Sequence, residues 1–145
     1  MQTTPATLPP KYGAPISLET AKRVMAAAEA EALAHHWPMA IAIVDSGGQL
    51  VMLHKMDQTQ HGSISVAQCK AETSVNFKRP TKAFEDMVAG GGIGLRFLSI
   101  REVSAVEGGL PLIVAGEIVG AIGVSGMKAD QDAQVAVAGA AVLQG

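Results

Sequence analysis

Histidine side chains are the first candidates for chemistry in this sequence, because imidazole is a common protein ligand of transition metals. His35 and His36 lie at the expected end of a helix, where a cationic side chain would complement the helix dipole. His54 falls within an expected strand. His61 lies in a polar loop beside Gly62, where a ligand can approach the backbone closely. We therefore expect His61 to be the histidine that binds a metal.

Two basic side chains, Lys70 and Arg79, point to an anionic ligand. Helical spacing places Lys70 on a stripe of small and mixed residues, from which its amine either reaches solvent or enters a cleft. Arg79 falls at the end of the same helix, where it either complements the helix dipole or anchors a carboxylate. Both are therefore candidate ligand-binding residues.

Two acidic side chains could lie near these cations. Glu107 precedes a backbone kink at Gly108–Pro111 and could face the same cleft as Lys70. A pair of Lys70 and Glu107 would form a general acid/base couple for a carboxylated metabolite. Asp57 follows a strand, so it is a candidate ligand contact, or it caps the loop that it opens.

Glycines interrupt the apolar strand near the C-terminus at positions 120, 123 and 126. Such gaps allow another backbone or a ligand to approach closely. Gly123 is therefore a candidate ligand-binding position, and the alternative is that it only lets a helix pack tightly on the sheet.

The elements that must position these residues follow from apolar periodicity and from turn residues. The strongest hairpin turns at Ala115–Glu117, where Gly116 can take a positive φ. A strand somewhere in 103–106 and a flexible connector over 89–94 are also expected. The remaining elements are helices over 17–36, 63–78, 81–88 and 130–143, and a hairpin formed by 39–45 and 50–56. Their order predicts an α/β (α+β) sandwich with an antiparallel sheet.

Composition limits the possible partners. A chain of 145 residues with 48% hydrophobic residues fits one domain, and we expect residues 1–16 to be a flexible segment before a single domain over 17–145. The net charge of −2 and the 3% aromatic content argue against nucleic-acid binding. There is neither a membrane-length apolar stretch nor an export signal, so we expect a cytoplasmic protein without membrane contact. Cys69 is the only cysteine, which excludes an internal disulfide.

Motifs along most of the chain resemble the GlcG/HbpS family, which includes the C-terminal domain of PduO proteins. They are Ile43–Gly48, Met56–Asp57, Ser63, Lys70–Ala71, Arg79–Thr81, Glu107–Pro111, Gly120–Gly126 and Asp130–Asp132. The resemblance implies a five-stranded antiparallel sheet between helices, as in profilin-like and roadblock-like folds. It also implies binding of haem or a related tetrapyrrole, although it does not by itself assign the iron ligand. His61, expected from its place in the loop to bind a metal, would then be that ligand.

Two functions therefore remain open at the level of the sequence. The first is a small-molecule binding protein for haem or a related tetrapyrrole. The second is a small catabolic enzyme, an isomerase, hydratase or decarboxylase, that uses Lys70 and Glu107 on a carboxylated metabolite. The apolar helix expected over 130–143 and the glycine-rich strand predict a homo-oligomer built from dimers, because soluble monomers rarely expose large apolar patches.

Overall fold

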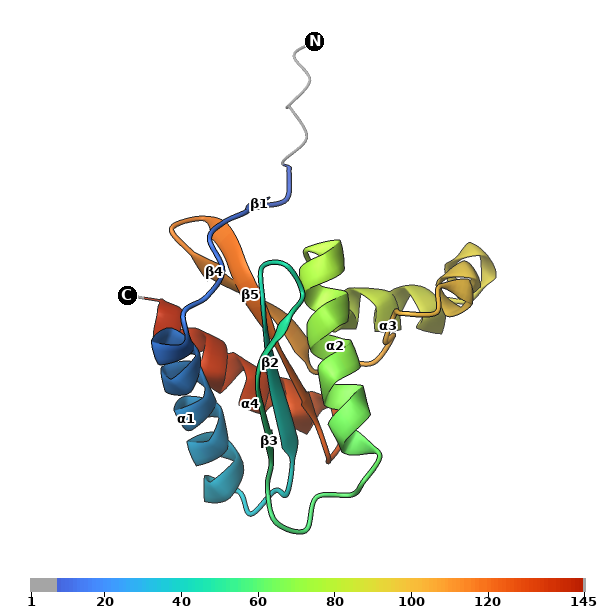
Figure 1. Cartoon of the computed structure of the whole chain (residues 1–145). Coiled ribbons are helices and arrows are strands. Elements are labelled where there is room, and N and C mark those ends of the chain that lie inside the picture. The colour runs from blue at the N-terminus through green and yellow to red at the C-terminus, as the bar shows by residue number, and fades with distance from the viewer. Residues whose placement is uncertain (1–7, 145) are drawn as a thin grey trace.

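The computed structural model describes residues 8–144. Its layered architecture follows from the way side chains alternate along one strand, β2 (Ala40–Asp45). Ile41 and Ile43 belong to the apolar cluster on one face of the sheet, whereas Ala40, Ala42 and Val44 belong to the cluster on the other. A strand buried on both faces must lie in the middle of a sandwich. Helices therefore cover both sides of the sheet (Figure 1).

Two antiparallel hairpins make up most of the sheet. β2 pairs with β3 (Leu50–Lys55), and β4 (Gly109–Val114) pairs with β5 (Glu117–Ser125). β2 and β5 join the hairpins as antiparallel neighbours. The predicted turn between β4 and β5 is confirmed, and both of its residues, Ala115 and Gly116, have positive φ values of 52° and 79°.

The fifth strand is β1 (Lys11–Tyr12), which pairs with the start of β5 in the parallel direction. The sheet is consequently mixed, and the prediction of a purely antiparallel sheet is wrong in this detail. The strand predicted within 103–106 is also wrong. That segment is irregular, and the backbone N–H of Ser104 donates to the Thr73 hydroxyl at 3.0 Å instead of to a neighbouring strand.

The helices begin and end close to the predicted positions. Ser17 caps α1 (Leu18–Ala34) by accepting a hydrogen bond from the backbone N–H of Thr20. The other helices are α2 (Ser63–Phe77), α3 (Thr81–Ala89) and α4 (Ala129–Ala140), with short 3₁₀ segments η1 (Gly92–Ser99) and η2 (Ala141–Leu143). η1 begins inside the segment for which the sequence predicts a flexible connector.

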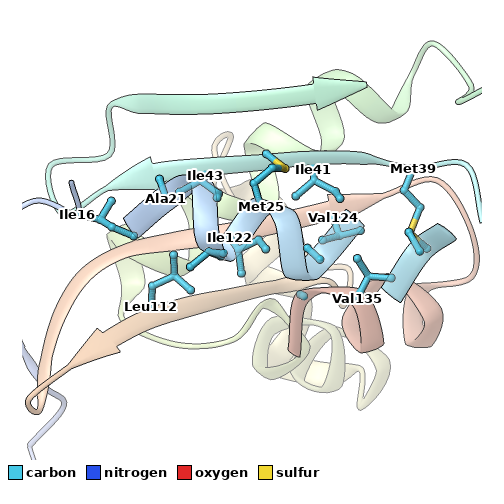
Figure 2. Packing of buried hydrophobic residues seen from close by; sticks show 14 residues of the cluster. Ile16, Ala21, Met25, Met39, Ile41, Ile43, Leu112, Ile122, Val124 and Val135 are labelled. Carbon is cyan, nitrogen blue, oxygen red and sulfur yellow. The ribbon is translucent and has the colours of Figure 1, made fainter. Parts of the chain in front are cut away.

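The helices divide between the two faces of the sheet. α1 and α4 cover the face on which Ile41, Ile122 and Val124 form the main core (Figure 2). α2 covers the other face, where Ala67 and Ala71 meet small residues of β2 and β5. Small side chains on both surfaces let α2 lie close against the sheet.

Residues 11–16, within the segment expected to be flexible, lie against this sandwich. The Gly13 backbone N–H donates to Ile118, and the Ile16 side chain is buried in the core beside α1.

Most of the exposed apolar surface lies away from α4 and β5, although Val137 of α4 is 55% exposed. On α4, Val135 and Ala136 are buried, and β5 is buried along most of its length. Ile93, Leu95 and Leu98 of η1 are instead 50–76% exposed, on the part of the chain that projects from the sandwich with α3 (Figure 1). None of the helices within residues 8–144 is long and apolar enough to cross a membrane.

Candidate functional site

Lys70 is the most deeply buried charged side chain of the predicted site. Its side chain is 1% exposed, and Nζ donates to Oδ2 of Asp132 at 3.1 Å and to the backbone oxygen of Val124 at 2.9 Å. The sequence predicted either a solvent-reaching or a cleft-lining amine, and both are wrong because the amine ends inside the protein. Burial raises the pKa of the Asp132 carboxyl, while the positive charge of Lys70 acts in the opposite direction.

A glycine makes room for this ion pair. A Cβ added at Gly108, whose φ is 134°, would lie 2.8 Å from Nζ of Lys70 and 3.1 Å from Cβ of Asp132. Lys70 on α2 therefore reaches Asp132 on α4 beside the point where β4 begins, although the two helices cover opposite faces. In the sequence, Asp132 stood out only as part of the Asp130–Asp132 motif.

Glu107 lies next to this glycine but takes part in other bonds. Its backbone N–H donates to the Glu85 carboxylate at 3.2 Å, which ties the segment before β4 to α3. Within residues 8–144, the hydrogen bonds and ion pairs of Lys70 do not include Glu107. Arg79 is exposed, donates from Nε to the backbone oxygen of Phe77 and lies over the Phe84 ring. The structure therefore does not bring Lys70, Arg79 and Glu107 together as a polar cluster.

Gly123 is a packing residue. A Cβ at this position would overlap the backbone oxygen of Ala67 and would lie 2.5 Å from the backbone nitrogen of Ala71. The gap in β5 is filled by the backbone of α2, so the alternative of tight helix packing describes this glycine.

A groove of about 500 Å³ lies at the end of the sheet where α1 and β3 both finish. Its volume is in the range of small-molecule sites. One wall comes from α1 and the turn after it, namely Glu29, Leu33, His36, Trp37 and Pro38. The other wall comes from the end of β3 and the following loop, namely Lys55, Met56, Asp57 and Gln58.

The backbone of the first wall is held by the way α1 ends. The N–H of Trp37 donates to the oxygen of Ala32 at 2.9 Å, and the N–H of His36 donates to that of Leu33 at 3.1 Å. This paired pattern places His36 in the left-handed conformation, with φ 58°. Glycine is the usual residue at this position, because a side chain there costs on the order of 1–3 kcal/mol.

The opposite wall contains a second residue of this kind. Gln58 has φ 69° in the turn that the Thr59 N–H closes on the Met56 oxygen. Within residues 8–144 four non-glycine residues have positive φ, and two of them, His36 and Gln58, face this groove. Backbone strain of this kind clusters at ligand-binding sites.

The four histidines differ in their partners. His35 stacks on Trp37 with ring centroids 4.3 Å apart and is bonded to Gln134, and His54 is bonded through Nδ1 to the Glu29 carboxylate. Within residues 8–144, no hydrogen bond or ion pair engages the imidazole ring of His36 or of His61. His61 is exposed and is not among the groove-lining residues, whereas the predicted ligand contact Asp57 is.

The groove offers several functional groups on a partly aromatic surface. It combines an imidazole, a thioether, an indole and an amine with two carboxylates. Among the residues that the structure describes, no three His, Cys, Asp or Glu side chains gather into a group that could hold a bare metal ion.

Comparison with known proteins agrees with this fold. The family described as haem-degrading protein HbpS-like matches residues 16–141. The chain belongs to the HbpS-like family. It is 41% identical over 110 residues to protein GlcG of Escherichia coli K12, covering 76% of this chain and 81% of GlcG. The resemblance to the GlcG/HbpS family is thereby confirmed.

Two solved structures of HbpS-like relatives superpose closely on this chain. The crystal structure of HbpS has a TM-score of 0.83, with 28% identity and complete coverage of both chains. The crystal structure of a PduOC:haem complex has a TM-score of 0.81, with 27% identity over 90% of this chain and 96% of that one.

Proposed function

We propose that this protein binds haem or a related tetrapyrrole as a homo-oligomer, and that the groove at the end of α1 and β3 receives the ligand. The groove carries the proposal, because it places an imidazole, a thioether and a cation around a space of about 500 Å³. Imidazole and thioether are common axial ligands of haem iron, and a lysine can pair with a propionate.

The relatives support the same class of ligand. The family description names haem degradation, and one superposable relative is a haem complex. The family model matches most of this chain, and the haem complex shares its fold over most of its length.

Lys55 is the lysine of the groove, and it would bind the acidic groups of the ligand, which the sequence analysis had expected of Lys70 and Arg79. Lys70 is committed to Asp132, and Arg79 is held at the end of α2. Among the groove carboxylates, Glu29 is already bonded to Nδ1 of His54.

The enzyme alternative has no comparable support. It required Lys70 and Glu107 to exchange protons with a substrate, and Lys70 lies at 1% exposure in an ion pair with another carboxylate. A binding role needs neither residue to reach solvent.

Hemin titration tests the proposal. Added hemin should give a sharpened and shifted Soret band that saturates at one hemin per chain, and Lys55→Ala should weaken binding more than Lys70→Met does in folded protein. The absence of a saturable spectral change in the unmodified protein would refute the function.

A further inference from the structure

We infer that His36, and not His61, is the imidazole through which the groove holds the metal of its tetrapyrrole. This inference rests on the proposed function and assigns the metal-contacting residue of the same site. From the sequence alone, His36 was expected to complement the helix dipole.

Elimination among the four histidines is the first argument. The imidazoles of His35 and His54 already have partners on α4 and α1 respectively. The rings of His36 and His61 make no hydrogen bond or ion pair within residues 8–144, and of these two histidines only His36 lines the groove. His61 lies farther along the loop, at the start of α2, and is exposed to solvent.

The backbone of His36 is the second, independent argument. Its left-handed conformation, with φ 58°, is one that glycine adopts without strain. A histidine at this position makes the end of α1 less stable than a glycine would. Within residues 8–144 its ring makes no hydrogen bond that would offset this loss of stability. A residue that costs stability and faces a cavity is best explained by what it binds there.

Neighbouring groups fit a metal-bearing macrocycle. Trp37 follows directly, and its indole is fixed by the stacked ring of His35, 16° from parallel. Met56 on the opposite wall supplies a thioether, the second common axial ligand of haem iron. His36 and Met56 thus line the same groove from opposite walls.

Replacing His36 with glycine tests the assignment, because backbone strain at this position predicts unchanged or higher stability, whereas a role in metal binding predicts weaker hemin binding. His36→Gly should melt at the same temperature as the unmodified protein or higher, since glycine suits the left-handed position. The same variant should bind hemin at least tenfold more weakly, as measured by Soret titration. Metal-free protoporphyrin IX, whose binding needs no axial ligand, should change less than threefold in affinity.

His61→Ala and His35→Ala are the matched controls, and both should keep hemin affinity within threefold of the unmodified protein. His36→Asn gives a second test with another residue that tolerates the left-handed conformation. It should also lose hemin affinity without losing stability.

The possible failures can be told apart. If the unmodified protein binds hemin and His36→Gly binds it equally well, the assignment of His36 is overturned and the proposed function stands. Loss of hemin binding in His61→Ala alone would return the role to the residue predicted from the sequence. If the unmodified protein binds no hemin, both the function and the assignment are overturned.

Discussion

Nζ of Lys70 on α2 lies 3.1 Å from Oδ2 of Asp132 on α4, so one ion pair joins the layers on opposite faces of the sheet. Both side chains are at most 3% exposed. Burial makes such a pair sensitive to the loss of either partner, since the charge that remains cannot reach water.

Asp132→Asn should therefore lower the free energy of unfolding by about 3–5 kcal/mol, because it leaves the buried amine of Lys70 without its charged partner. Chemical denaturation followed by circular dichroism measures this change. The double variant Lys70→Met/Asp132→Leu should be more stable than Asp132→Asn alone. Lys82→Met, which removes an exposed pair on α3, is the control and should have a much smaller effect. A loss below 1 kcal/mol in Asp132→Asn would show that the pair is not structurally important.

Gly123 and Gly62 form a contrasting pair of glycines. Gly123→Ala forces a methyl group into the backbone of α2 and should cost at least about 1–3 kcal/mol, the usual range for overpacking. Gly62→Ala meets no atom within 4 Å and should leave stability nearly unchanged. Thermal unfolding of both variants measures the difference. A wild-type melting temperature in Gly123→Ala would reopen a ligand-binding role for this glycine.

Glu85 should make stability depend on pH in the acid range. The ion pair with Lys82 lowers the pKa of Glu85, and the hydrogen bond from the backbone of Glu107 adds to this effect. The unfolded chain takes up this proton first, so the stabilisation is present above the ordinary glutamate pKa of about 4.3 and is lost as pH falls through the lowered value. The difference in free energy of unfolding between the unmodified protein and Glu85→Gln should thus shrink as pH falls from 6 toward 3. A difference that grows on acidification would contradict the assignment.

Self-association should depend on η1. Ile93 and Leu98 are 76% and 64% exposed, an unusual surface for a soluble monomer. We expect light scattering to show an oligomer of even order, and Ile93→Glu/Leu98→Glu to reduce its mass. Val137→Glu, at an exposed position of α4, should not reduce it. A monomeric mass for the unmodified protein at micromolar concentration would show that the predicted oligomer does not form.

Elements with strong local signals could be predicted from the sequence. The start of the first helix, where Ser17 caps α1, and the Ala115–Gly116 turn are local features, and both are found where the helix and the turn were predicted. β1 could not be predicted, because its two residues become a strand only through pairing with Glu117 and Ile118. The apolar pair Val103 and Val106 suggested a strand, yet the contact with Thr73 fixes an irregular backbone there.

The site was harder to predict because its groups meet through tertiary contacts. Asp57 was found by its place at a strand end, and it lines the groove. The partner of Lys70 is 62 residues away and is reached only past Gly108, which no local pattern reveals. His36 was read as the end of a helix, although a histidine where glycine normally ends α1 was a signal that the sequence did contain.

Amide NMR spectra of the protein with bound hemin test the central claim most directly, since paramagnetic iron broadens the signals of nearby residues. Zinc protoporphyrin is the diamagnetic control, and only the hemin-specific broadening counts. We predict that it centres on residues 36–38 and 55–58, the two walls of the groove, and spares Lys70 and Asp132. Broadening centred on the Lys70–Asp132 pair, or the absence of any saturable change, would contradict the account.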